Sequence, residues 1–179
     1  MQRQVMSTKT LTRSAILVAL AIILTRFLSV MLTENLRLGI GWMPIVLTGT
    51  LYGPFVGAIC GVVEDLLGII INSQGTVHFG FTLSAMLTGL IPGLISYYFM
   101  KNKSDNLVIA VSCIAVAIIV HCLLNTLWLS QLYGNGFLVL LPTRVVKVAI
   151  ETFLVIVTGQ ITNRLLKNCL LYTSPSPRD

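Results

Sequence analysis

Long apolar runs, separated by short polar or Gly- and Pro-containing stretches, set the pattern of this chain. Six runs are expected to form helices, at residues 11–32, 38–52, 54–71, 80–100, 107–132 and 143–166. Crossing the apolar core of a bilayer takes about 20 apolar residues in a helix. The runs are continuous rather than alternating, which argues against a membrane barrel. The pattern therefore predicts an all-α, polytopic membrane protein with six transmembrane helices.

Composition supports this interpretation. Of the 179 residues, 55% are hydrophobic and only 10% are charged, too little charge for the surface of a soluble domain. The net charge of +6 does not indicate nucleic-acid binding, because many cations cluster at the ends of the apolar runs. These cations are Arg3, Lys9, Arg13, Lys101, Lys103, Arg164 and Lys167. By the positive-inside rule, their positions predict that the N- and C-termini are cytoplasmic.

The two chain ends and the cysteines add little chemistry. No signal-peptide cleavage site follows the first apolar run, so we expect this run to stay as a membrane span. We predict one six-helix membrane domain over residues 1–171, followed by a disordered or non-native tail over residues 172–179, rich in Ser and Pro. The four cysteines lack metal-type spacing, and no metal site is expected.

Four further cations fall toward the outer half of the membrane, against the charge rule: Arg26, Arg37, Arg144 and Lys147. Ionisable groups inside a membrane are candidates for function, and arginine pairs well with carboxylates. Snorkelling to the outer headgroups is the alternative interpretation. On the last apolar run, Glu151 shares a face with Arg144 and Lys147 and lies roughly 10 Å deeper than Arg144. We expect it to pair with Lys147 or an arginine and neutralise it.

Polar and aromatic side chains also line the fifth run. His121, Asn125 and Trp128 stand at i, i+4 and i+7, which places them on one helical stripe. His121 is also explained as a packing residue, and Trp128 as part of an interfacial aromatic belt. Together with the outer cations, the stripe predicts an outward-facing pocket for an anionic, aromatic ligand.

Two sets of small residues suggest close helix contacts. Gly53, Gly57 and Gly61 repeat at four-residue spacing, which favours packing within the protein. Ala15 and Ala19 have the same spacing on the first run, where internal packing and docking of another protein both fit. The chain has no phosphate-binding loop of the GxxxxGK[ST] type, so it cannot hydrolyse ATP by that route, and a ligand pocket without a motor of its own implies a partner.

An ordered set of segments resembles the folate-type substrate-binding (S) components of energy-coupling-factor (ECF) transporters. The segments are GWMPIVLTG at 41–49, LYGP at 51–54, GVVEDLLG at 61–68, GFTLSA at 80–85 with LTG at 87–89, LNTLWL at 124–129 and LLPTR at 140–144. The resemblance covers most of the chain, in order, from the first run to the sixth. The family pattern has a proline in the loop before the fourth run, whereas residues 74–82 contain none.

The resemblance implies a vitamin-binding membrane subunit, not an enzyme and without a cofactor of its own, in a bacterial plasma membrane. It would work with a transmembrane scaffold and two ATPases that use ATP. Ala15 and Ala19 match the family's scaffold-docking signature. In this hypothesis Arg26, Arg37, Arg144 and Lys147 hold the carboxylates of a folate-like ligand, while other side chains contact its ring system, namely Phe79, Thr82, Asn125 and Trp128.

Three alternatives stay open at this point. The chain is an S component for another anionic vitamin or precursor; or a small membrane enzyme with Glu64, Asp65 and His121 as acid and base groups; or a purely structural assembly subunit. The enzyme hypothesis requires these three side chains to converge on one cavity.

Overall fold

The structure is a computed structural model that describes residues 8–33, 36–72, 78–100, 103–134 and 136–172. Side chains are described for all of these except 30–33, 36–37 and 167–172. The predicted tail at 172–179 therefore lies outside the described residues, apart from the backbone of residue 172.

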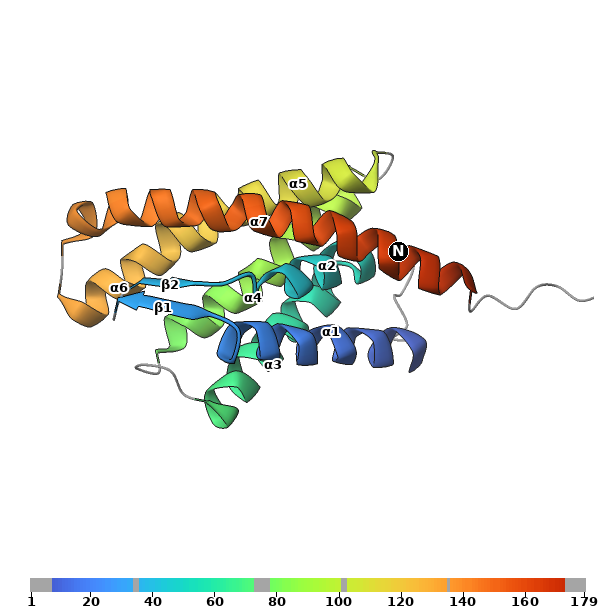
Figure 1. Cartoon of the computed structure of the whole chain (residues 1–179), viewed down its shortest axis with the longest axis horizontal. Coiled ribbons are helices and arrows are strands. Elements are labelled where there is room, and N and C mark those ends of the chain that lie inside the picture. Colours follow the sequence, from blue (N-terminus) through green and yellow to red (C-terminus); the bar gives the residue numbers. More distant parts are fainter. Residues whose placement is uncertain (1–7, 34–35, 73–77, 101–102, 135, 173–179) are drawn as a thin grey trace, which may run out of the picture.

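The fold is a bundle of helices with one short β-hairpin (Figure 1). At one end of the bundle lie the start of α1 and the last turns of α7. At the other lie the hairpin and α6. In chain order the elements are α1 Thr8–Arg26, β1 Val30–Thr33, β2 Leu36–Leu38, α2 Met43–Tyr52, α3 Pro54–Ile71, α4 Phe79–Leu94, η1 Ile95–Phe99, α5 Asp105–Val116, η2 Ala117–Leu124, α6 Asn125–Tyr133 and α7 Phe137–Tyr172.

Helix α2 lies at the centre of the bundle. Every residue from Met43 to Gly49 is buried, and the helix contacts α1, α3, α4, α5 and α7. One side packs Ile45 against Val18 and Val56; another packs Leu47 against Ile109 and Val155. A helix that is apolar all round suits such a position.

Glycines bring α3 and α4 into close backbone contact. A Cβ atom at Gly57 would collide with the carbonyl oxygen of Gly89, and one at Gly61 would collide with that of Ala85. The α3–α4 pair makes the most extensive contact in the bundle. This confirms the prediction that the glycine repeat serves packing within the protein, as small residues do in membrane helices.

The hairpin corrects the predicted limits of the first two runs. Helix α1 ends at Arg26 rather than near residue 32, and α2 begins at Met43 rather than near residue 38. Antiparallel strands β1 and β2 occupy part of the interval. Two features favour a late start for α2: glycines at 39 and 41 precede it, and Pro44 lies in its first turn, where a proline is well tolerated. The all-α fold class is confirmed, with this short hairpin as an addition that the prediction lacked.

The other runs follow the prediction more closely, with two differences. The fourth and fifth runs each contain a π-helical segment, η1 at the end of α4 and η2 between α5 and α6. Helix α7 begins at Phe137, six residues before the predicted start at 143, and includes Pro142 near its beginning.

Four helical segments of the described chain are long and apolar enough to cross a membrane: Thr8–Arg26, Pro54–Ile71, Phe79–Phe99 and Asp105–Tyr133. Many large apolar side chains point outward, including Ile70 at 79% exposure and Phe153 at 69%. Exposure on this scale fits a lipid-facing surface. Six spans and cytoplasmic termini remain predictions.

Candidate ligand-binding site

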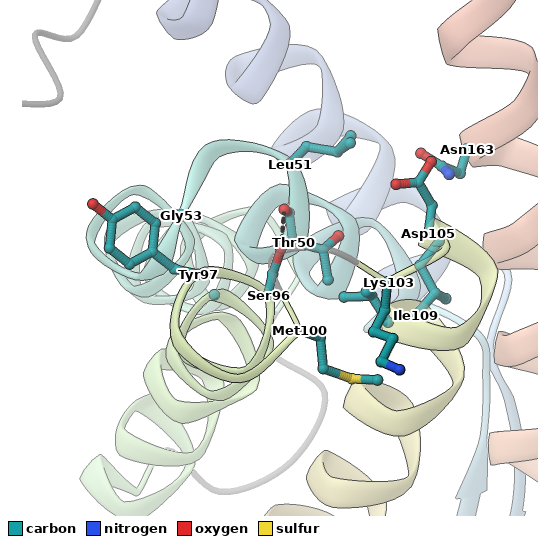
Figure 2. Close-up of a pocket in the computed structure, with 12 residues that line it drawn as sticks. Thr50, Leu51, Gly53, Ser96, Tyr97, Met100, Lys103, Asp105, Ile109 and Asn163 are labelled. Atoms are coloured by element: carbon teal, nitrogen blue, oxygen red, sulfur yellow. Dashed lines mark hydrogen bonds between the residues drawn. The ribbon is translucent and has the colours of Figure 1, made fainter.

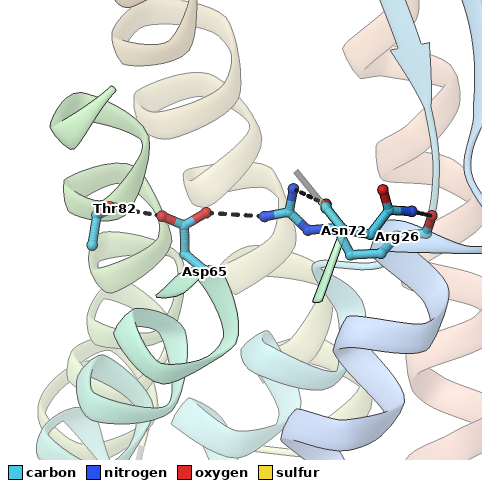
Figure 3. A network of polar contacts seen from close by, with 4 residues as sticks. All are labelled: Arg26, Asp65, Asn72 and Thr82. Atoms are coloured by element: carbon cyan, nitrogen blue, oxygen red, sulfur yellow. Dashed lines mark hydrogen bonds and ion pairs between the residues drawn. The ribbon is translucent and has the colours of Figure 1, made fainter. Parts of the chain in front are cut away.

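Arg26, Asp65, Asn72 and Thr82, here called the Arg26 network, join three helices near the hairpin end of the bundle (Figure 3). The Arg26 Nη2 atom lies 3.4 Å from Asp65 Oδ1, and Thr82 donates to Asp65 Oδ2 at 2.7 Å. Arg26 Nη1 also donates to the Asn72 carbonyl oxygen at 3.4 Å. Both oxygens of Asp65 are therefore engaged by the protein itself.

The Arg26 network shows that Asp65 has a structural role, which the sequence alone did not predict. Arg26 and Asp65 are both buried, and a buried charge requires a partner close by. The carboxylate therefore neutralises Arg26 while it ties α1 to α3 and α4. Gly68 leaves the space that the guanidinium fills, since a Cβ atom there would lie 2.5 Å from Arg26 Nε.

A second group, here called the His121 cluster, consists of Trp42, His121, Asn125, Arg144 and Lys147. The rings of Trp42 and His121 are 4.8 Å apart between centroids, and the Asn125 Nδ2 atom lies 3.3 Å from His121 Nδ1. Arg144 and Lys147 lie close enough to His121 to interact with it electrostatically. The cluster thus combines flat rings, an amide and two cations, drawn from the residue before α2 and from η2, α6 and α7.

Three polar atoms of the His121 cluster are buried and have no hydrogen-bond partner among the described residues. They are Trp42 Nε1, His121 Nε2 and Asn125 Oδ1. Such atoms are rare in folded proteins, because each one left unpaired costs about 1–3 kcal/mol. A ligand with complementary donors and acceptors would remove this cost. Among the described residues, this grouping of unpaired atoms beside two cations makes the His121 cluster the candidate binding site.

Glu151 connects the His121 cluster to the hairpin. Its Oε2 atom lies 2.9 Å from Lys147 Nζ, which confirms the predicted pairing. Its Oε1 atom accepts a hydrogen bond from the backbone N–H of Gly39 at 2.9 Å, just after β2. Lys147 is therefore held in place from the side of the hairpin, and Arg144, which is also buried, interacts electrostatically with the same carboxylate.

Trp128 contacts α4 and does not belong to the His121 cluster. Its Nε1 atom donates to Ser84 Oγ at 3.2 Å, and its ring lies 5.7 Å from that of His78 between centroids. Gly80 packs directly against the indole, where a Cβ atom would collide with it. Trp128 is thus an aromatic wall fixed by the first turns of α4.

The structure does not gather all the predicted residues into one place. Asn125, Arg144 and Lys147 belong to the His121 cluster, Arg26 and Thr82 to the Arg26 network, and Trp128 to the α4 wall. Phe79 is 89% exposed, so its ring lies outside these groups. Arg37 lies on β2, and its side chain is outside the described residues. Residues 73–77 of the loop before α4 are also outside them.

Sequence reasoning did not assign a ligand contact to Trp42, Ser84 or His78. Trp42 was noticed only as part of the segment at 41–49. Its position directly before a short, largely apolar helix is the signal that the sequence offers. Ser84 and His78 carried no comparable signal, because their importance comes from contact with Trp128, which lies more than forty residues away along the chain.

The two alanines of the predicted docking signature lie on the outer face of α1. Both Ala15 and Ala19 are exposed, while Leu17 and Val18 of the same helix are buried. They are therefore open to another protein in the membrane and do not take part in the packing of the bundle.

In the part of the chain that the structure describes, a helical bundle with an apolar exterior encloses a polar cluster with unpaired atoms, an arrangement that suits a ligand-binding membrane protein. The family described as "ECF transporter, substrate-specific component" matches residues 9–173. The chain therefore belongs to this family, and it is a multi-pass membrane protein of ECF transporters.

Relatives agree with this assignment. The "Folate transporter FolT" of Clostridium novyi (strain NT) is 38% identical over 136 residues, covering 76% of this chain and 77% of that protein. The "Folate transporter FolT" of Leuconostoc mesenteroides subsp. mesenteroides is 29% identical over 138 residues, covering 74% and 72%.

Solved structures share the fold. "Crystal structure of FolT bound with folic acid" matches with a TM-score of 0.73 and 26% identity, over 89% of this chain and 97% of that one. "Structure and mechanism of the S component of a bacterial ECF transporter" matches with a TM-score of 0.64 and 24% identity, over 90% and 97%. The second likeness concerns the fold alone.

Membership of this family sets the enzyme hypothesis aside, because the family is a transporter component. The geometry agrees: Asp65 belongs to the Arg26 network, whereas His121 contacts Trp42 and Asn125. An acid and a base that serve one reaction need to reach the same substrate.

Proposed function

We propose that this chain is the folate-binding subunit of an ECF-type importer and that the His121 cluster is the core of its binding site. The observation that carries the proposal is a set of three buried polar atoms that have no hydrogen-bond partner among the described residues and lie beside two cations. Folate presents a flat ring system with hydrogen-bonding edges and a carboxylate-bearing tail. Those are the groups that this set of side chains would complement.

In this proposal each part of the site has its own task. Trp42, His121 and Asn125 offer two ring surfaces and the unpaired polar atoms to the ligand's ring system. Arg144 and Lys147 attract the carboxylates from the side of the hairpin. Trp128 stacks on the ligand, while Arg37, Phe79 and Thr82 remain predicted contacts. Arg26, already paired with Asp65, acts mainly by shaping the wall of the site.

Binding affinity of the purified chain tests the substrate. We expect folate to bind with a dissociation constant below about 1 µM, corresponding to more than about 8 kcal/mol of binding free energy. Biotin, also anionic, should bind far more weakly because it lacks the flat two-ring system. Arg144→Met should weaken folate binding by at least about tenfold, whereas Arg164→Met, on an exposed residue of the same helix, should not. A folded protein that ignores folate would refute the substrate.

The exposed alanines support a proposal about partners. We infer that Ala15 and Ala19 dock a transmembrane scaffold subunit, which in turn connects to two ATPases, in the plasma membrane of a bacterium. An exposed pair of small residues at four-residue spacing lets another helix approach closely.

Transport and binding measured side by side test the docking role. Ala15→Trp and Ala19→Trp should abolish folate uptake by the assembled transporter and leave folate binding by the isolated subunit unchanged. Ile161→Trp, at an exposed position of α7, is the matched control and should leave both intact. Normal uptake by the alanine variants would remove this docking surface.

A further inference from the structure

A cavity of about 260 Å³ lies at the opposite end of the bundle from the hairpin, among the end of α2, η1, the start of α5 and α7 (Figure 2). Its polar lining includes Lys103, Asp105, Asn163 and three hydroxyl residues, and Met100 and Ile109 supply apolar lining. None of these residues belongs to the Arg26 network or the His121 cluster. The volume is below that of most sites for drug-sized ligands, so it suits a smaller group.

Asn163 is the feature that marks the cavity as a site. The residue is only 2% exposed, it lines the cavity, and its Oδ1 atom has no hydrogen-bond partner in the part of the chain that the structure describes. A buried amide oxygen in this state lacks an N–H or O–H donor. The carboxylate of Asp105 lines the same space, so the missing donor is best supplied by a positively charged group.

The opposite charge is present at the same cavity. Lys103 is exposed and contributes to the lining, and its ammonium group is a donor only. Asn163 Oδ1 and the Asp105 carboxylate are therefore acceptors for a positively charged group. Lys103 is a donor for a negatively charged one. A zwitterionic ligand matches both.

The surroundings place this cavity at the depth of lipid headgroups. Tyr97 lines it and is followed by Tyr98 and Phe99, and all three aromatic side chains are exposed. The rings of Tyr97 and Tyr98 are in edge contact at 5.0 Å between centroids. Exposed aromatic residues next to a lysine at the end of an apolar helix are typical of the boundary between acyl chains and headgroups.

We propose that this cavity binds a phospholipid headgroup that carries a primary ammonium, of the phosphoethanolamine type. The ammonium donates hydrogen bonds to Asn163 Oδ1 and the Asp105 carboxylate, while the phosphate accepts from Lys103. The acyl chains run outward past Tyr97 and the exposed apolar surface. The site is independent of the proposed folate site, at the other end of the bundle.

Native mass spectrometry of the full chain, purified in detergent and stripped of lipid, tests this proposal. Dioleoyl phosphatidylethanolamine should bind more tightly than dioleoyl phosphatidylcholine, whose trimethylated nitrogen has no N–H to donate. Asn163→Leu should lower the affinity for the ethanolamine lipid by about fivefold, the effect of one hydrogen bond, and reduce its advantage over the choline lipid. Equal retention of both lipids by the parent chain would overturn the proposal.

Two further variants keep the test decisive. Lys103→Met changes an exposed residue and should also weaken binding of the ethanolamine lipid by about fivefold. Arg164→Met, one residue after Asn163 but exposed and not part of the lining, should bind as the parent does. Unchanged binding by both Asn163→Leu and Lys103→Met contradicts the site, whereas folate affinity should be unaltered in all three.

Soluble glycerophosphoethanolamine distinguishes a lipid from a free metabolite of the same chemistry. The headgroup alone should compete only at concentrations at least about tenfold above those of the lipid, because burial of acyl chain adds to the affinity. Competition at equal concentration would overturn the lipid as the source.

Discussion

The Arg26 network and the His121 cluster both place polar side chains in half-buried or buried positions inside the bundle, and they differ in which of their polar atoms the protein itself engages. In the Arg26 network, each oxygen of Asp65 has a partner on another helix. In the His121 cluster, three polar atoms on three residues have none among the described residues. The protein itself engages the whole carboxylate of Asp65 in the first arrangement, whereas in the second, three polar atoms of the described residues are left for a ligand.

This difference separates two uses of polar groups inside a membrane protein. A paired charge such as Arg26 holds helices in register, and its removal exposes the partner to an apolar surrounding. An unpaired donor or acceptor weakens the empty protein and favours the state with ligand bound. A charged residue within a span is therefore a weaker guide to a ligand-binding site than a group of buried polar atoms without hydrogen-bond partners.

The largest effect is expected from Asp65→Leu, which breaks the Arg26 network. The buried guanidinium would lose its carboxylate, so the free energy of unfolding should fall by about 3 kcal/mol or more. The measurement is thermal unfolding of the empty protein in detergent.

The double variant Arg26→Leu/Asp65→Leu is the matched control. It removes both charges, so it should recover much of the lost stability, because a buried ion pair is often replaceable by apolar side chains. If Asp65→Leu instead melts like the parent and only loses folate, the Arg26 network is part of the ligand site and the contrast fails.

A smaller effect, on binding rather than on stability, is expected from Trp42→Phe. The substitution removes an indole N–H that makes no hydrogen bond within the described protein and keeps a ring beside His121. Folate affinity should drop by about tenfold, or about 1.4 kcal/mol, as measured by titration calorimetry. A drop in melting temperature without any change in affinity would show that Trp42 only packs.

The smallest effect is expected from the matching substitution Trp128→Phe. Here the lost N–H is bonded to Ser84, so the stability of the empty protein should fall by about 1 kcal/mol. Folate affinity should change by less than about threefold, since a phenyl ring still offers a face for stacking. Equal binding losses in the two tryptophan variants would contradict the distinction drawn here.

Sequence patterns predicted the parts of this molecule that depend on local signals. Apolar runs located the helices α3, α4 and α5 closely, and four-residue spacing identified the glycine contacts, whereas for Ala15 and Ala19 it left packing and docking both open. The Lys147–Glu151 pair was also predictable, because residues four apart on a helix meet. Family resemblance then supplied the class of protein.

Contacts between distant segments could not be predicted in the same way. The partner of Arg26 is 39 residues away, and nothing in the spacing distinguishes Asp65 from Glu64 beside it. The hairpin was missed because its strands are short and extend an apolar run, so periodicity could not separate them from a helix end. Ser84 became important only through Trp128, on another helix.

The π-helical segment η2 affects the direction in which the side chains that follow it in the fifth run point. A π-helix takes more residues per turn than an α-helix and commonly amounts to an inserted residue. If Ala117–Leu124 wound as an ordinary α-helix with the same number of residues, each residue would turn the chain by about 100°, which is more than in a π-helix, and α6 would be rotated about its axis. The indole of Trp128 would then leave Ser84 for a different neighbour. In this sense η2 acts as an angular offset, which sets the direction of every side chain that follows it in the run.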